Sequence, residues 1–134
     1  MSTPVIRYNS VLLIDDNEID NFINERMIST SGFSNKVIVK TSCDEAIKFL
    51  NQVENDSDAI PDIVFLDLNM PGKDGFAFLT DFENFSEAVK AKCKIVVLSS
   101  SISPDDINRA STNPYVIKYV NKPLSEKYLS AIVL

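Results

Sequence analysis

Short apolar runs alternate with longer amphipathic segments along the whole chain. Each run is three to five residues long, and most are apolar throughout, which is typical of strands buried on both faces of a sheet. We therefore expect five strands, at residues 11–14, 37–39, 63–66, 95–98 and 116–120.

The segments between these strands repeat apolar residues every three or four positions, which predicts helices. Ser42 followed by Glu45 has the form of a capping box, and Ser103 stands directly before Pro104, a residue suited to a first helical turn. We expect five helices: 17–30, 42–53, one through Phe78, Phe82, Phe85 and Val89, one that opens at Ser103 and is closed by Asn113, and 125–133. In the first helix, Ile19, Phe22, Ile23 and Met27 fall on one side.

This alternation predicts an α/β fold, in which a five-stranded parallel sheet carries helices on both faces. Because crossover connections are right-handed, the sheet should be doubly wound. A length of 134 residues corresponds to one domain, residues 1–134, with a core from about residue 10 to 133. In such folds ligands bind beyond the carboxyl ends of the strands, where the strand order reverses.

Polar residues follow four of the predicted strands at this edge: Asp15, Asp16, Asp67, Ser99 and Lys122. Each alone has an ordinary explanation as a helix cap, a turn or loop residue, or a surface lysine. Together they bring carboxylates close enough that one pair about 4 Å apart would cost on the order of 4 kcal/mol. Mg²⁺ would relieve this repulsion, and the hydroxyl and the ammonium would bind a phosphoryl oxygen. The pattern predicts a carboxylate that is phosphorylated beside Mg²⁺.

Composition narrows the function classes further. Thirteen basic residues against nineteen acidic ones give a net charge of −6, which argues against nucleic-acid binding and against a basic membrane tether. The chain has no histidine, which excludes histidine metal sites, histidine-based catalytic triads and a phosphohistidine of its own. Cys43 and Cys93 lie in apolar segments and predict free thiols in a reducing compartment. With no signal peptide and no apolar run of about 20 residues, we expect a cytoplasmic protein.

Four segments carry a resemblance to a known family: residues 11–16, 65–75, 97–100 and 119–123. Together they resemble the receiver domains of response regulators in two-component signalling. The resemblance covers nearly the whole chain. It implies a flavodoxin-like sheet with strand order 2-1-3-4-5 and five flanking helices. It also implies a single-domain, chemotaxis-type protein without an output domain.

The resemblance implies a role for each acidic residue at the strand ends. Asp67 would accept the phosphoryl group. Asp16 and Asp67 would bind Mg²⁺ directly, or Mn²⁺ in its place, while Asp15 would act through water. The backbone carbonyl of Asn69 would be a further metal ligand.

The remaining residues of these segments would bind the phosphoryl group or shape the site. The resemblance implies that Ser99 and Lys122 contact phosphoryl oxygens and that Tyr119 is an aromatic switch that turns inward when Ser99 moves. It implies a cis peptide bond between Lys122 and Pro123. The residues that shape the loops would be Pro71, Gly72, Gly75 and Pro123.

The expected function is a phosphorylation-activated switch rather than an enzyme with a separate substrate. A histidine kinase or histidine phosphotransfer protein would donate to Asp67. The chain's own chemistry would be Mg²⁺-dependent self-catalysed phosphotransfer and autodephosphorylation. The surface of the fourth expected helix and fifth strand would then bind a partner, or the chain would pass the phosphoryl group onward. We expect a monomer or a weak, phosphorylation-dependent dimer. Three alternatives remain: an aspartyl-phosphate phosphohydrolase, in which Asn69 would replace the usual second Asp; a flavodoxin-like nucleotide binder, which Asp15 and Asp16 disfavour; and a receiver that is not phosphorylated.

Overall fold

The computed structural model describes residues 7–132 and contains a five-stranded parallel sheet. The strand order is β2-β1-β3-β4-β5, as expected for the doubly wound fold. Each predicted strand is present to within one residue at either end. The strands are β1 (Val11–Ile14), β2 (Val37–Lys40), β3 (Ile63–Leu66), β4 (Lys94–Ser99) and β5 (Val116–Asn121).

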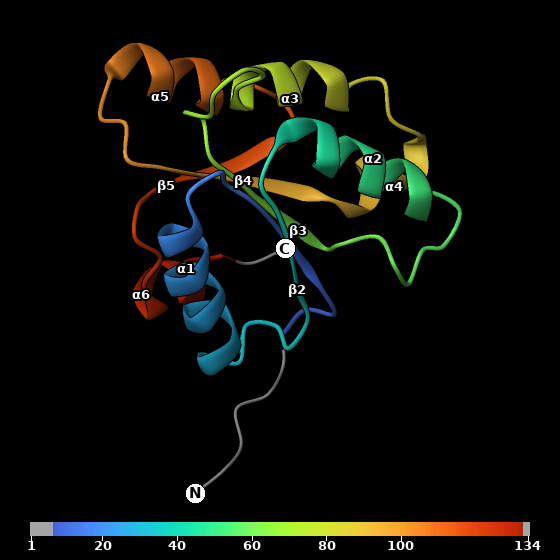
Figure 1. The fold of residues 1–134 in the computed structure, drawn as a ribbon, viewed down its shortest axis with the longest axis horizontal. Coiled ribbons are helices and arrows are strands. Elements are labelled where there is room, and N and C mark those ends of the chain that lie inside the picture. The colour runs from blue at the N-terminus through green and yellow to red at the C-terminus, as the bar shows by residue number, and fades with distance from the viewer. Residues whose placement is uncertain (1–6, 133–134) are drawn as a thin grey trace, which may run out of the picture.

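Helices cover both faces of the sheet (Figure 1). One face carries α1 (Glu18–Thr30) and α6 (Glu126–Ala131), and the other carries α2 (Cys43–Val53), α3 (Gly75–Phe82), α4 (Glu87–Lys92) and α5 (Pro104–Ser111). The last helix ends at Ala131, with Ile132 as its C-cap, two residues before the predicted end at Val133, which itself lies outside the described residues. Within residues 7–132, no helix combines the length and the apolar character needed to cross a membrane.

Side-chain oxygens start the helices where the sequence places them. The Ser42 hydroxyl accepts the N–H of Glu45 at 3.2 Å, and the Ser103 hydroxyl accepts the N–H of Asp106 at 3.4 Å. The Glu45 carboxylate reaches back to the N–H and the hydroxyl of Thr41, one residue earlier than in a regular capping box. The polar starts of α2 and α5 are therefore confirmed as caps.

The third predicted helix is two helices, so residues 7–132 contain six helices and the expected number of five is wrong. The apolar face is confirmed, because Phe78, Phe82, Phe85 and Val89 are all buried. The break comes from Ser86, whose hydroxyl accepts the N–H of Val89 at 3.3 Å and starts α4 as a new helix. A serine that bonds to the backbone ahead of it competes with continuation of the helix behind it.

Three of the four apolar residues expected on one side of α1 face solvent, whereas the fourth, Met27, is partly buried and packs against the core. Ile19, Phe22 and Ile23 are 71%, 67% and 44% exposed. The buried face instead contains Asn21 and Asn24 together with an isoleucine near the end of the helix. Helical spacing predicted the helix but not which side packs on the sheet.

Candidate functional site

A polar hollow lies at the carboxyl edge of the sheet, where the strand order reverses between β1 and β3. Its lining comes from the residues after β1, the first turn of α1, and the residues after β3, β4 and β5. These are Asp15, Asp16, Asn17, Asp20, Asp67, Asn69, Ser100 and Lys122. The hollow therefore occupies the position at which ligands bind to doubly wound sheets.

Three aspartates converge in this hollow. Among residues 7–132, Asp15, Asp16 and Asp67 form the only group of three or more potential metal ligands, each offering a ligand atom within 4.8 Å of the others. Asp15 and Asp67 are buried, whereas Asp16 is exposed. Short backbone bonds orient the buried pair: Asp15 Oδ1 accepts the N–H of Asn17 at 3.0 Å, and Asp67 Oδ1 accepts the N–H of Asn69 at 3.3 Å.

Lys122 places its ammonium among these carboxylates. Its Nζ lies 2.5 Å from Asp15 Oδ2, 2.9 Å from Asp20 Oδ2 and 3.5 Å from Asp67 Oδ2. Burial by itself would lower the pKa of Lys122. The ion pairs with Asp15 and Asp20 and the charge of Asp67 outweigh burial, so the pKa of this ammonium is raised. Lys122 is therefore a permanent positive charge inside the hollow.

Asp67 is the acid most affected by its surroundings. Burial and the neighbouring charge of Asp15 raise the pKa of Asp67 from 3.8 to about 6, against the opposing effects of Lys122 and of the Asn69 N–H. A buried carboxylate with a raised pKa in a polar hollow is a common property of reactive groups. Asp67 is still ionised at neutral pH and can act there as a nucleophile.

The donor set fits a hard divalent cation. One ammonium faces four carboxylates in the hollow, those of Asp15, Asp16, Asp20 and Asp67, so the site keeps an excess of negative charge. Mg²⁺ prefers oxygen ligands such as carboxylates. One ligand atom from each of Asp15, Asp16 and Asp67 lies within 4.8 Å of the other two, so these three side chains could hold one such cation together.

The other expected phosphate ligand, Ser99, lies at the same edge but does not line the hollow. Ser99 is buried at the end of β4, and its hydroxyl accepts the N–H of Ser101 at 3.1 Å. Ser100 takes its place in the lining. The half-buried Tyr119 donates its hydroxyl to the backbone oxygen of Ser101 at 2.9 Å, so Ser99 and Tyr119 are linked through one residue.

The loop residues adopt the backbone geometry that their types allow. Gly72 has φ +76°, a left-handed conformation that side chains disfavour, and lies with Pro71 at the exposed turn after β3. Gly75 is buried, and a Cβ there would lie 2.5 Å from the backbone oxygen of Asp67. The peptide bond between Lys122 and Pro123 is cis, as expected.

Comparisons with known proteins agree with this architecture. The family model of the response regulator receiver domain matches residues 11–134. This chain belongs to that family. A two-component response regulator of Cytophaga hutchinsonii is 35% identical, with 92% of each chain covered and a TM-score of 0.86. The probable methanogenesis regulatory protein FilR2 of Methanothrix harundinacea is 32% identical over 92% of this chain and 77% of its own length. The Mn²⁺-bound form of response regulator Rcp1 is 26% identical over 90% and 86% of the two chains, with a TM-score of 0.69.

The sequence analysis gave no site role to three residues that line the receiver site: Asn17, Asp20 and Ser100. Asn17 is the N-cap of α1, and Ser100 directly follows β4. Asp20, in the first turn of α1, is a direct partner of Lys122 at 2.9 Å. The signal available was weak: Asp20 stands four residues after Asp16, one helical turn into the segment that begins at the same sheet edge. Acidic residues in a first helical turn are common for reasons of the helix dipole alone, so the pairing with Lys122 required the fold.

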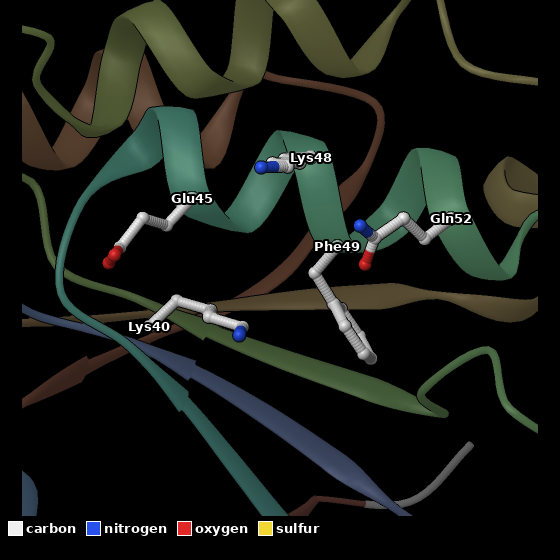
Figure 2. A pocket seen from close by; sticks show the side chains of 5 residues that line it. All are labelled: Lys40, Glu45, Lys48, Phe49 and Gln52. Atoms are coloured by element: carbon white, nitrogen blue, oxygen red, sulfur yellow. The ribbon is translucent and has the colours of Figure 1, made fainter.

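A second hollow of the receiver domain lies away from the aspartates, between β2 and α2 (Figure 2). Lys40 comes from β2, and the other lining residues, Glu45, Lys48, Phe49 and Gln52, come from α2. The Lys40 ammonium lies 5.5 Å from the centroid of the Phe49 ring, a cation–π contact. These side chains form no group of potential metal ligands within residues 7–132, so the candidate site is the hollow at Asp67.

Proposed function

We propose that this receiver domain is a switch in two-component signalling and that Asp67 accepts its phosphoryl group. The observation that carries the proposal is the position of Asp67: buried at a strand end, beside Asp15 and Asp16, with the Lys122 ammonium 3.5 Å away. A nucleophilic carboxylate, a site for a cation and a fixed positive charge are the groups that phosphoryl transfer needs.

In the proposed reaction, a carboxylate oxygen of Asp67 attacks the phosphorus of a phosphohistidine on another protein. The new O–P bond forms as the P–N bond breaks, and the electron pair of that bond stays on the imidazole nitrogen, which takes a proton from solvent. Asp15, Asp16, Asp67 and the backbone carbonyl of Asn69 would hold Mg²⁺ or Mn²⁺, which supplies positive charge opposite the phosphoryl oxygens when bound. The relative Rcp1 is known in a Mn²⁺-bound form, which supports binding of a divalent cation by this chain.

Phosphorylation would then act on β4, β5 and α5. Phosphorylation converts the Asp67 carboxylate, with a charge of about −1, to an acyl phosphate with a charge of about −2 and further acceptor oxygens, which attract the Ser99 hydroxyl and the Lys122 ammonium. When Ser99 turns toward the phosphoryl group, its hydroxyl no longer accepts the N–H of Ser101. Ser101 is then free to move, and its backbone oxygen is the acceptor that holds the Tyr119 hydroxyl. The surface of α5 and β5, which corresponds to the fourth expected helix and fifth strand, changes as a result and would contact an output protein.

The start of α1 lines the hollow, so a donor bound over Asp67 would lie beside this helix. Ile19, Phe22 and Ile23 are exposed on the same helix that supplies Asp20 to the hollow. We propose that the donor, a histidine kinase or a phosphotransfer protein, contacts this apolar surface. Cys43 and Cys93 are both unpaired, which agrees with an exchange in the reducing cytoplasm.

Labelling with acetyl phosphate and Mg²⁺ tests the acceptor. The wild-type chain should gain the mass of one phosphoryl group, and Asp67→Ala should gain none. Asp58→Asn, which changes an exposed loop aspartate, is the matched control and should be labelled as the wild type is. A phosphoryl group that persists in Asp67→Ala would refute the assignment.

A further inference from the structure

Asp20 is a fourth carboxylate of the hollow for which the phosphorylation chemistry provides no role. It stands outside the group of Asp15, Asp16 and Asp67 that is spaced for a metal ion. Its contact is the Lys122 ammonium, at 2.9 Å from Asp20 Oδ2. The hollow therefore contains an acid that engages the lysine without joining the metal ligands.

The local structure of α1 directs this carboxylate. Asn17 is the N-cap, and its side-chain oxygen accepts the N–H of Asp20 at 3.0 Å, which fixes the first turn. The Asp20 side chain is 36% exposed, whereas the Lys122 side chain is 12% exposed. Asp20 thus approaches the ammonium from the solvent side, and Asp15 and Asp67, which are 1% and 5% exposed, approach it from inside.

We propose that Asp20 is a positioning residue that holds Lys122 in the unphosphorylated protein and competes with the phosphoryl group for it. This inference rests on the proposed function of Asp67. In this state the Lys122 ammonium donates a hydrogen bond to Asp20 Oδ2 at 2.9 Å, and the carboxylates of Asp15 and Asp67 lie within ion-pair distance of it. A phosphoryl group on Asp67 adds acceptor oxygens with greater charge than one carboxylate, and Lys122 must turn from Asp20 to meet them.

The competition sets how strongly the site holds a phosphoryl group. Phosphorylation breaks or weakens the ion pair of Asp20 and Lys122. The free energy of this pair therefore opposes binding of the phosphoryl group and lowers the affinity of the site for it. The free energy of a partly exposed ion pair corresponds to a factor of about two to five in affinity. Removing the Asp20 charge should therefore tighten binding of a phosphoryl mimic by about two- to fivefold.

The test uses beryllium fluoride with saturating Mg²⁺, a tetrahedral mimic of a phosphoryl group on a carboxylate, and measures its Kd by calorimetry. Four proteins are compared: wild type, Asp20→Asn, Asp20→Glu and Glu18→Gln. Glu18→Gln is the matched control, because it removes one negative charge from the same helical turn at an exposed residue that has no contact with Lys122. Asp20→Glu keeps the charge and a carboxylate within reach of the ammonium.

The expected result is a two- to fivefold lower Kd for Asp20→Asn, little change for Glu18→Gln, and a Kd close to wild type for Asp20→Glu. Equal effects of Asp20→Asn and Glu18→Gln would overturn the inference, because net charge alone would then explain them. A higher Kd for Asp20→Asn would overturn the inference too, since Asp20 would then favour binding of the mimic rather than compete with it for Lys122. If beryllium fluoride bound neither the wild type nor any of the variants, the result would instead refute the proposed function of Asp67.

Discussion

Replacement of Asp67 by Asn should stabilise the protein at neutral pH in the absence of Mg²⁺. The pKa of Asp67 is raised from 3.8 to about 6 by burial and by the charge of Asp15. Between about pH 4 and pH 6, the folded state therefore holds a proton on Asp67 that the unfolded chain has already released. The stability that this group contributes is full below about pH 4 and is lost as the pH rises through about 6. Asn has nearly the same shape and carries no charge, so it removes the cost of ionising a buried carboxylate.

The size of the effect follows from that pKa. At about 1.4 kcal/mol for each pH unit, the difference between 3.8 and about 6 corresponds to about 3 kcal/mol at pH 7.5. The Asp67 side chain is 5% exposed, so solvent screening reduces this value little. At pH 4 the same reasoning leaves less than about 1 kcal/mol. For a domain of this length, about 3 kcal/mol corresponds to a rise in Tm of about 11 °C.

Urea unfolding of wild type and Asp67→Asn at several pH values between 4 and 8, with a chelator present, measures the difference directly. The gap in unfolding free energy should open as the pH rises through about 6. Asp58→Asn, at an exposed loop position, should show no such opening. A gap that is independent of pH, or a less stable Asp67→Asn at pH 7.5, would show that the Asp67 carboxylate is not held at an energetic cost.

Three further predictions address the metal, the loop and the donor surface. Mg²⁺ should raise the Tm of the wild type, and at one hundred times its Kd the stabilisation should be about 2.7 kcal/mol. The rise should be much smaller in Asp16→Asn, and an equal rise in both proteins would argue against the metal site. Gly75→Ala should destabilise the fold by about 1–3 kcal/mol in urea unfolding, because its Cβ would meet the Asp67 backbone oxygen at 2.5 Å; unchanged stability would mean that the backbone there moves freely. Phe22→Ser should slow transfer from a phosphorylated histidine protein while labelling by acetyl phosphate and Tm stay nearly unchanged, because Phe22 is 67% exposed; equal loss with both donors would place the effect in the chemistry instead.

The strands and the location of the site were predictable because both depend on local sequence and on general topology. Strands such as β1 and β3 are buried on both faces, so nearly every residue in them must be apolar. Parallel strands end at one edge, so the residues that follow them, such as Asp15, Asp67 and Lys122, had to meet there. The membership of the receiver family agrees with the predicted fold class.

The side of α1 that packs on the sheet was not predictable, because its partners lie far away in the sequence. Asn21 donates its side-chain amide to the backbone oxygen of Asp15 at 2.8 Å. Asn24 accepts the N–H of Leu124, one hundred residues later, at 3.1 Å. These bonds satisfy polar groups that would otherwise be buried without partners, so asparagine is favoured where helical spacing alone would place an apolar residue.

Two other features depended on competition between local and distant interactions. The segment of α3 and α4 could form one longer helix or two helices separated by a cap at Ser86. The spacing of its apolar residues is the same in both cases and does not distinguish them. The contact of Asp20 with Lys122 joins residues 102 positions apart and carries no sequence pattern of its own. Both became visible only when the elements were placed in space.

The most direct test of the central claim is to locate the phosphoryl group on the chain. After reaction with acetyl phosphate and Mg²⁺, borohydride reduction converts an aspartyl phosphate to homoserine, and peptide mass spectrometry identifies the modified residue. The account predicts a single modification, at Asp67. Modification of Asp15, Asp16 or Asp20, or of no aspartate at all under conditions in which a known receiver domain is modified, would contradict it.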